Sequence, residues 1–300
     1  MSKDANTFDR YRPKLHGIAY RMLGSRADAE DVVQDAYLRW HGTDTAELRS
    51  PEAWLVTVVT RLSLDRLRAA KVERQAYAGQ WIPEPLVEAH APPADQAVEI
   101  AGDLSIAFLM VLERLAPEER AAFLLHDVFD ISYAEIATMI GKRQDACRQA
   151  VHRARRRVRR DRPRFQVDRE DHRRLLERFV EASRSGDREA LLSLLAEDVS
   201  FTSDGGGKVP SVSKVLHGAV PVARFYQGIA RRIGGRAHFH LAQVNGSPGI
   251  LRYLDGDLDS VTSLVTDGRR IVEIYTIRNP DKLARIEHDL PAPTAATPSR

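Results

Sequence analysis

"LAPEERAAFLLHDVFDISYAEIATMIGKRQDACRQAVHRARRRVRR", residues 115–160, contains the signals of three consecutive helices. A proline at a first helical position, Pro117, predicts a helix that runs through Val128. Ser132 and Glu135 form an S-x-x-E capping box for a second helix, which ends at Gly141. The apolar face of the third helix is formed by Cys147, Ala150, Val151, Ala154 and Val158. Two helices joined by a tight glycine turn, the second one basic, predict a helix-turn-helix.

The outer face of the third helix is polar and strongly basic. Residues 142–164 contain eleven Lys or Arg and two acids, whereas residues 1–141 contain 15 basic and 22 acidic residues. A recognition helix reads base edges with its early residues and contacts phosphates with later arginines. The residues expected to contact DNA are therefore Arg143, Gln144, Arg148, Gln149, His152, Arg153 and Arg156.

An amphipathic helix nearer the N-terminus carries an acidic row. Ser25 is its expected N-cap, and its apolar stripe is Ala29, Val32, Val33, Ala36, Tyr37 and Trp40. On another face, Asp28, Asp31 and Asp35 recur at i, i+3 and i+7, with Gln34 beside them. Such a row suits a basic surface on a partner.

A second long helix is predicted from Pro51, after the N-cap Ser50, through about Arg74. Its later turns carry arginines, including Arg61 and Arg66. Trp54 lies on its apolar stripe, where it either packs in a core or stacks on an unpaired base. This helix combines a packing face with a basic end.

Residues 77–96 contain four prolines and are predicted to form a linker. Because Trp81, Ile82 and Leu86 lie between the prolines, we expect part of the linker to dock on a surface. A second helical unit begins near Ala97. From residue 166 the pattern changes to a helix, a short helix and alternating strands separated by Asn-Gly and Asp-Gly turns, which indicates an α+β domain with a disordered tail from about residue 289.

The stretch "TSDGGGKVPS", residues 202–211, has the look of a phosphate-binding loop. In a Walker A loop the lysine is followed by Ser or Thr at a helix start, whereas here Val209 and Pro210 follow Lys208. Nucleotide binding is therefore not expected. Two interpretations stay open: a turn whose glycines supply positive φ, or a docking loop in which Lys208 meets an acidic partner such as Glu84 or the acidic row of residues 28–35.

Composition and motifs exclude several other classes. No apolar run reaches the roughly 18 residues of a membrane span, the first dozen residues lack a signal core, and a single cysteine cannot form an internal disulfide. His238 and His240 provide only two ligands for a metal, and "DGDLDS" at 255–260 lacks the later residues of a calcium loop. We expect a cytoplasmic protein without cofactor, metal or membrane contact.

The two helical modules together resemble an extracytoplasmic-function sigma factor. "YRPKLHGIAYRMLGSRADAEDVVQDAYLRW" with "SPEAWLVTVVTRLSLDRLR" resembles sigma region 2, and residues 115–160 resemble region 4. The resemblance implies that Asp28, Asp31, Gln34 and Asp35 bind the clamp helices of RNA polymerase. It also implies that the 43–50 loop and the helix from Pro51, with Trp54, Arg61 and Arg66, read the minus-10 element, while the face from Arg143 to Arg156 reads minus-35. The family often has Ser where this chain has Arg143.

The C-terminal third resembles a SnoaL-like domain, and three short motifs resemble those of one sigma factor subgroup. They are "WIPEPL" at 81–86, "DGGGK" at 204–208 and "NPDKL" at 279–283. The resemblance implies that they meet at a regulatory interface formed by Trp81, Pro83, Glu84, Pro85, Asp204, Gly205, Gly206, Gly207, Lys208, Asn279, Pro280, Asp281 and Lys282.

These observations predict a multidomain fold. Two all-α sigma domains, a region 2 helical bundle at 1–76 and a region 4 helix-turn-helix at 97–165, are joined by the 77–96 linker and followed by a SnoaL-like α+β cone at 166–300. The expected function is a non-enzymatic one, a sigma factor that binds core polymerase and promoter DNA and is regulated in cis by the cone, which is a candidate site for a small-molecule ligand. The alternatives are a one-component helix-turn-helix regulator with a ligand-sensing cone and, less favoured, a cone with isomerase or cyclase activity.

Overall fold

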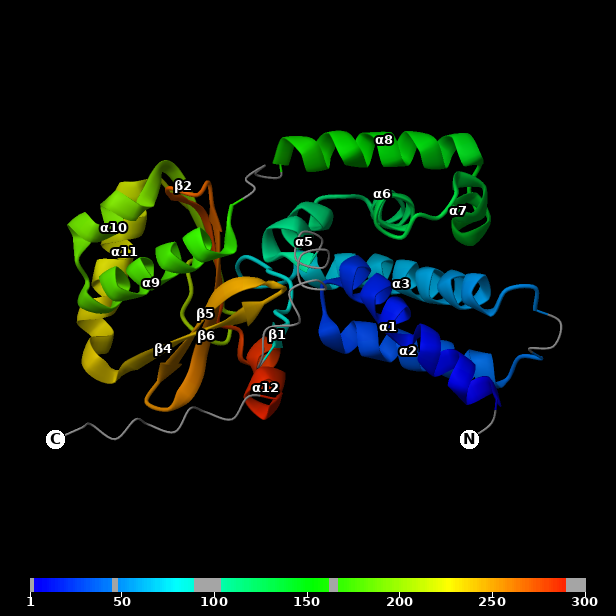
Figure 1. Ribbon diagram of the computed structural model, residues 1–300, viewed down its shortest axis with the longest axis horizontal. Coiled ribbons are helices and arrows are strands. Elements are labelled where there is room, and N and C mark those ends of the chain that lie inside the picture. The colour runs from blue at the N-terminus through cyan, green and yellow to red at the C-terminus, as the bar shows by residue number, and fades with distance from the viewer. Residues whose placement is uncertain (1–2, 45–47, 89–103, 162–166, 290–300) are drawn as a thin grey trace. The chain divides into compact units, whose positions relative to one another are not determined.

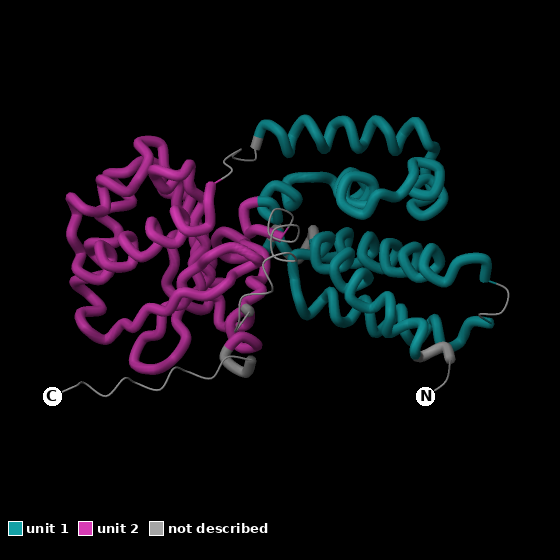
Figure 2. Tube along the Cα trace, viewed as in Figure 1, with its two compact units in different colours: residues 1–76, 108–162 teal, residues 77–107, 163–300 magenta. Residues whose placement is uncertain are grey.

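The computed structural model describes residues 3–44, 48–88, 104–161 and 167–289. The chain forms two compact units, residues 1–76 with 108–162 and residues 77–107 with 163–300 (Figure 2). The described part of the linker, residues 77–88, therefore belongs to the same unit as the C-terminal domain. The predicted start of a helical unit near Ala97, the end of the linker and the predicted disordered tail lie outside the described residues.

Three long helices form the N-terminal part of the first unit (Figure 1). They are α1 (Lys3–Leu23), α2 (Arg26–His41) and α3 (Pro51–Gln75), and each packs against the other two. The predicted caps are confirmed: the hydroxyl of Ser25 accepts from the backbone N–H of Asp28 at 3.2 Å, and that of Ser50 from Ala53 at 3.2 Å. Their shared core is apolar and fully buried, with Leu15, Ile18, Ala29, Trp40, Leu55 and Val59 at its centre.

The rest of the first unit contains the helix-turn-helix. It comprises α5 (Ile106–Glu113), α6 (Pro117–Phe123), the π-helix η2 (Leu124–Val128), α7 (Tyr133–Ile140) and α8 (Gln144–Asp161). The helix predicted through Val128 therefore has the right span, but its last turn widens to i→i+5 hydrogen bonds, as between Phe129 N–H and Leu124 O. The capping box of Ser132 and Glu135 is present, and Gly141 ends α7 with a φ of 65°.

The second unit is built on a seven-stranded sheet in the order β1-β4-β5-β6-β7-β2-β3. The strands are β1 (Val87–Glu88), β2 (Leu195–Asp204), β3 (Leu216–His217), β4 (Ala237–Val244), β5 (Ser247–Leu254), β6 (Asp257–Thr266) and β7 (Ile271–Ile277). All neighbours are antiparallel except β2 and β7, which are parallel. The predicted α+β class is confirmed, and β4 to β7 are the four alternating strands expected from the sequence.

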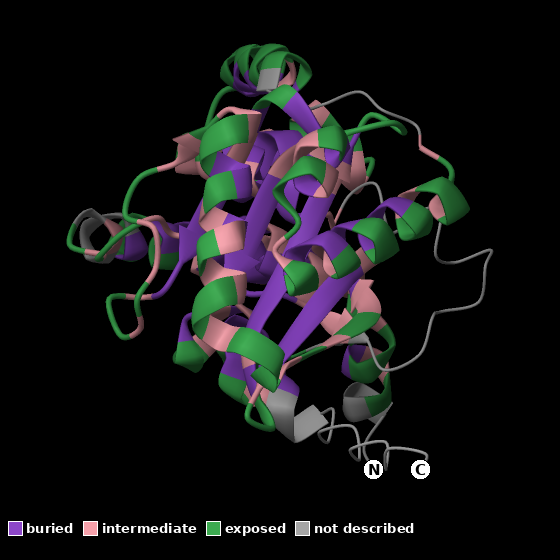
Figure 3. Ribbon diagram, turned by 90° about the vertical axis from the view of Figure 1, so that its left-hand side faces the viewer, coloured by how far each residue is buried: buried purple, intermediate pink, exposed green. Residues whose placement is uncertain are grey.

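Helices cover this sheet and close its core. They are α9 (Arg169–Ser185), α10 (Arg188–Leu194), α11 (Ala219–Ile233), the short 3-10 helix η3 (Gly234–Arg236) and the final α12 (Pro280–Asp289). Figure 3 shows the buried strands in purple beneath helices with exposed outer faces. The Asn245–Gly246 and Asp255–Gly256 turns have positive φ at both residues, so "DGDLDS" is a hairpin turn. No helix among the described residues is long and apolar enough to cross a bilayer.

Candidate DNA-binding, polymerase-binding and linker-docking sites

The helix α8 presents the predicted DNA-contacting residues to solvent. All seven, Arg143, Gln144, Arg148, Gln149, His152, Arg153 and Arg156, are exposed, while Cys147 and the rest of the apolar stripe are buried. Burial raises the pKa of the Cys147 thiol, so this residue is a packing group. Later in the helix, Arg153, Arg156, Arg157, Arg159 and Arg160 surround a shallow cavity with Glu119, a charge balance that favours phosphate.

The helix α2 carries the predicted polymerase-binding row. Asp31, Gln34 and Asp35 are exposed on one face, whereas Asp28 is half-buried and accepts a hydrogen bond from Arg66 at 2.9 Å. Leu38 continues the same face and is 61% exposed, which makes it the most exposed large apolar side chain in the described residues. Sequence reasoning missed Leu38, although its i+3, i+4 and i+7 spacing from the acidic row was available.

Residues of α3 predicted to contact the promoter already have partners within the first unit. Arg61 donates to the backbone oxygens of Met139 and Thr138 in α7 at 2.9 and 3.1 Å, and Arg66 is paired with Asp28. Trp54 is half-buried and packs on Trp40, with ring centroids 5.7 Å apart. Residues 45–47 of the predicted minus-10 loop lie outside the described part of the chain.

The three short motifs meet around one buried carboxylate in the second unit. The side chain of Asp204 is fully buried and accepts hydrogen bonds from the Tyr77 hydroxyl (2.6 Å), the backbone N–H of Ile82 (3.0 Å) and the Lys282 ammonium (2.7 Å). The Gly206 N–H adds a fourth at 2.9 Å. A buried charge needs such partners, because an unpaired carboxylate in the interior is strongly unfavourable.

Lys282 connects the linker to this carboxylate. Its ammonium also donates to the backbone oxygen of Ile82, and it lies 4.2 Å from the centre of the Trp81 ring and 5.4 Å from that of Tyr77. Burial, reinforced by the hydrogen bond to Asp204, raises the pKa of Tyr77 well above its usual value. Tyr77 therefore remains a hydrogen-bond donor at any physiological pH. The prediction that part of the linker docks on a surface is confirmed for these residues.

The glycine loop is shaped by close approach as well as by backbone conformation. Gly206 and Gly207 have φ of 63° and 71°. A Cβ on Gly206 would lie 2.5 Å from the Asn279 side chain, and one on Gly207 would lie 2.7 Å from the Ala78 Cβ. Both open interpretations therefore apply: the loop is a positive-φ turn, and it is packed against the "NPDKL" motif and the linker.

Within its own unit Lys208 pairs with Asp281 and not with Glu84. The Lys208 ammonium lies 2.6 Å from the Asp281 carboxylate, and both side chains are more than half exposed. Glu84, the partner suggested from sequence, is buried. Sequence reasoning placed both lysines in motifs but did not distinguish the exposed Lys208 from the buried Lys282, and it missed Tyr77 altogether.

The described part of the docked linker ends as a strand, β1. Leu86 N–H donates to the Asn245 side chain at 3.0 Å, and Asn245 N–H donates back to the Leu86 oxygen at 2.7 Å. Val87 and Glu88 then pair with Val244 and Gln243 of β4. This pairing covers the edge of the sheet, which explains why a proline-rich segment keeps a defined path. Pro83 and Pro85, between the two anchors, are buried.

Comparison with known proteins places both helical modules in one family. Residues 7–72 match the Sigma-70 region 2 model, and residues 105–158 match the Sigma-70 region 4 model. The chain is 39% identical over 292 residues, 93% of both chains, to the ECF RNA polymerase sigma factor SigJ of Mycobacterium tuberculosis. It belongs to the ECF sigma factors. It is also 31% identical over 283 residues, covering 93% of this chain and 94% of the relative, to the probable sigma factor SigI of that organism.

The likeness extends through the C-terminal domain of this sigma factor. The crystal structure of the Mycobacterium tuberculosis SigJ superimposes with a TM-score of 0.76 at 38% identity, covering 93% of this chain and 98% of the other. Sigma region 2 thus comprises α2 with most of α1 and α3, region 4 comprises α5 to α8, and the third part is the α+β domain built on the seven-stranded sheet. The expected sigma factor, with its modules in this order, is confirmed.

The C-terminal α+β domain of this sigma factor contains a partly open cavity of about 220 Å³. It lies between the sheet and the helices α9 and α11, and its apolar lining includes Phe179, Phe201, Phe225, Ile229, Phe239 and Ile250. This volume is below the roughly 300–1,000 Å³ of pockets for drug-sized molecules. His238 and His240 lie exposed on β4 outside it, and no group of three His, Cys, Asp or Glu residues in the described segments could hold a metal ion.

Proposed function

We propose that this sigma factor binds core polymerase through the exposed face of α2, with Asp31, Gln34, Asp35 and Leu38, while Asp28 adds charge at the helix start. Its α3 would contact the minus-10 element through Trp54, Arg61 and Arg66. Arg143 and the six exposed residues of α8 named above would contact minus-35. Exposure and charge of these faces support the assignment. Working with polymerase, the protein would act in the cytoplasm.

The first unit is closed as it stands. Because Arg61, an exposed residue, donates to backbone oxygens of α7, it must give up these hydrogen bonds before it can contact DNA. Polymerase can shift the population towards an open form if it binds that form more tightly. We therefore propose that the isolated sigma factor is held in a form that is not competent for promoter binding.

The observation that carries cis regulation is the docking of the linker on the SnoaL-like domain. Residues 77–88 are held by Asp204, Lys282 and β4, and 17 residues of the sequence separate β1 from α5. A chain of 17 residues spans at most about 60 Å at roughly 3.3–3.6 Å per residue, and releasing residues 77–88 would add at most about 40 Å. The two promoter elements are about 25 base pairs apart by their names, roughly 85 Å along B-DNA. A docked linker would thus restrain the two DNA-binding modules.

Transcription with purified core polymerase tests the surface assignments. Asp35→Arg should weaken core binding, because it reverses the charge of the exposed row. Asp198→Arg, an equally exposed position in β2, is the matched control. Arg148→Ala should reduce promoter binding and leave core affinity unchanged. Equal core affinity of Asp35→Arg and the wild type would remove α2 from the polymerase-binding surface.

A small-molecule ligand for the SnoaL-like domain is a second part of the proposal. The cavity between α9, α11 and the sheet supports it, since aromatic side chains line most of it and a few polar side chains complete the lining. Binding there would be measured by calorimetry on the full chain. A saturating heat signal that disappears when the cavity is filled by substitution is the expected result.

A further inference from the structure

The polar side of the cavity carries an excess of positive charge. Arg252 and Arg278 line it, and both donate to Asp259: Arg252 Nε at 2.9 Å and Arg278 Nη2 at 2.7 Å. Arg252 also donates through a second nitrogen to the same carboxylate oxygen. The side chains of Arg252 and Asp259 are about nine-tenths buried. One carboxylate therefore pairs with two guanidinium groups, which leaves one positive charge unmatched.

Two buried donors of residues that line the cavity have no partner among the described residues. The Nε of Arg278 is buried without a hydrogen bond, while its other two nitrogens donate to Asp259 and to the backbone oxygen of Pro210. At the other end, Ser183 is 93% buried and its hydroxyl has no hydrogen-bond partner among the described residues. Buried donors that lack partners are rare in folded proteins and point to a bound group.

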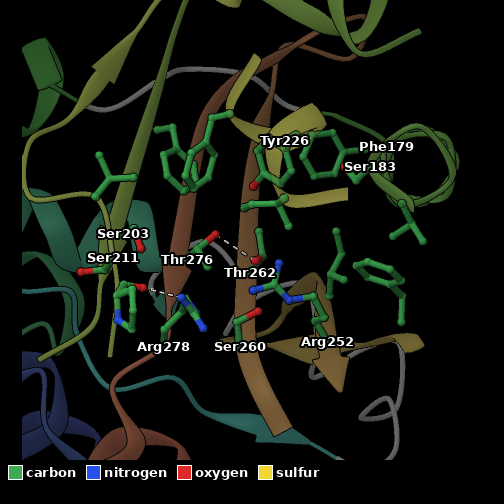
Figure 4. Close-up of a pocket in the computed structure, with 18 of the residues that line it drawn as sticks. Phe179, Ser183, Ser203, Ser211, Tyr226, Arg252, Ser260, Thr262, Thr276 and Arg278 are labelled. Atoms are coloured by element: carbon green, nitrogen blue, oxygen red, sulfur yellow. Dashed lines mark hydrogen bonds between the residues drawn. The ribbon is translucent and has the colours of Figure 1, made fainter. Parts of the chain in front are cut away.

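Figure 4 shows how these groups are divided across the cavity. Arg252, Arg278 and Ser260 lie at one end, and Ser183 lies beside Phe179 at the other. The hydroxyls of Thr262 and Thr276 lie between them and hydrogen-bond to each other at 2.9 Å. The cavity is thus amphipathic along its length, with a cationic end and an aromatic body.

The titratable groups of the cavity are suited to binding and poorly suited to proton transfer. Burial acts to raise the pKa of Asp259, but Arg252 and Arg278 outweigh it and lower the pKa below its ordinary value. Such a carboxylate is a weak base. Burial raises the pKa of Tyr226 to about 12, so its hydroxyl stays protonated. Neither group has the near-neutral pKa that general acid-base catalysis favours.

We propose that the cavity binds a small aromatic or alicyclic carboxylate, whose anionic group pairs with Arg252 and Arg278 and whose ring lies against Phe179, Phe225 and Phe239. This inference rests on the proposed ligand site and adds the chemical class of the ligand. Guanidinium groups match carboxylates in shape and charge, and the excess positive charge leaves room for one anion. A further hydrogen-bonding group on the ring would meet Ser183.

Calorimetry with the full chain and a matched pair of probes tests the class. The carboxylate 2-naphthoate and the uncharged 2-naphthamide have nearly the same shape. We expect 2-naphthoate to bind at least about tenfold more tightly, because only it forms charge-assisted hydrogen bonds. Equal affinities, or no binding of 2-naphthoate at millimolar concentration, would overturn the assignment of an anionic ligand.

Variants show whether the probe is in the cavity. Arg278→Gln should weaken 2-naphthoate binding about tenfold and change 2-naphthamide binding little. Arg236→Gln is the control, since Arg236 pairs with Asp255 on the exposed surface. Ile229→Trp, at a partly exposed position of the lining, should abolish binding of both probes without touching the arginines. Unchanged binding in Ile229→Trp would place the probe elsewhere and overturn the proposal.

The regulatory proposal is tested by a separate measurement. Binding is measured without polymerase, so it supports or overturns the carboxylate site whatever happens in transcription. If 2-naphthoate binds as expected but leaves promoter output unchanged, the site stands and cis regulation by that probe does not.

Discussion

Asp204 and Asp259 are two buried carboxylates of the same SnoaL-like domain with opposite surroundings. Asp204 receives four hydrogen bonds, from Tyr77, Ile82, Gly206 and Lys282, all from this chain. Asp259 is held by two arginines that line a cavity, and the Nε of Arg278 has no hydrogen-bond partner among the described residues. The first arrangement is complete without a ligand, whereas the second leaves an unmatched positive charge.

The partners of the two carboxylates determine what each site can do. A buried ion pair whose hydrogen bonds are all made holds two segments together, because removing either partner leaves the other as an unpaired buried charge. A site with an unmatched positive charge suits an anion. The linker-docking site is therefore complete within the chain, and the cavity is the site for which we propose a ligand. The following predictions separate these two roles.

The largest effect is expected for Asp204→Ala. The change leaves the Lys282 ammonium buried without its carboxylate, which typically costs about 3–5 kcal/mol. Unfolding of the full chain in urea should show the loss, and limited proteolysis should cut near residues 77–88. Proteolysis equal to that of the wild type would mean that the linker is held by its other contacts alone.

A smaller loss is expected for Gly206→Ala. The residue has φ of 63°, and the new Cβ would lie 2.5 Å from Asn279. Positive φ alone costs about 1–2 kcal/mol for an L-residue. Gly141→Ala is the control, because its φ of 65° is nearly the same and nothing lies within 4 Å of the added Cβ. The difference between the two variants isolates the packing of the glycine loop against "NPDKL", and equal losses would reduce the loop to a simple turn.

Whether a contact can be predicted from the sequence depends on how many positions separate the two residues that form it. Capping by Ser25 and Ser132, the αL glycine at 141 and the Asn-Gly turn are local, so they were predicted and are confirmed. In the Asp204 site, Tyr77 lies 127 positions from Asp204 in the sequence and Lys282 lies 78 positions from it. Neither periodicity nor motif spacing encodes contacts over such distances. The motifs therefore indicated which segments meet but did not indicate Asp281 as the partner of Lys208.

The cavity was beyond prediction for a similar reason. Arg252 lies in a strand whose alternation gives no sign that an arginine is buried, and its partner Asp259 comes from the next strand across a hairpin. Only the folded sheet brings these residues together with Arg278 of the segment after β7. The sequence suggested a ligand in the domain without any residue to hold it.

The pH dependence of the domain tests the charge state of Asp259. Because its pKa is lower in the folded chain than the ordinary 3.8, ionised Asp259 contributes stability that is present above that value and lost as the pH falls through the folded pKa. Asp259→Asn should flatten this acid limb in urea unfolding measured below pH 5. An unchanged acid limb would show that Asp259 is not under the influence of its arginines.

The smallest effect is expected for Lys208→Glu. Its pair with Asp281 is exposed at both ends, and such pairs are worth roughly 0–1 kcal/mol. Stability in urea should therefore change by less than about 1 kcal/mol. A loss as large as that of Asp204→Ala would show that the exposed lysine, and not Lys282, holds the motifs together.

Promoter output of Lys282→Met and Lys208→Met, compared in single-round transcription with limiting sigma factor and saturating core polymerase, tests the central claim most directly. Both changes remove one lysine charge from the same cluster of motifs, but only Lys282 bonds the linker. If the docked linker restrains the two DNA-binding modules, Lys282→Met will raise initiation several-fold and Lys208→Met will match the wild type. Equal output from the two variants would contradict the claim.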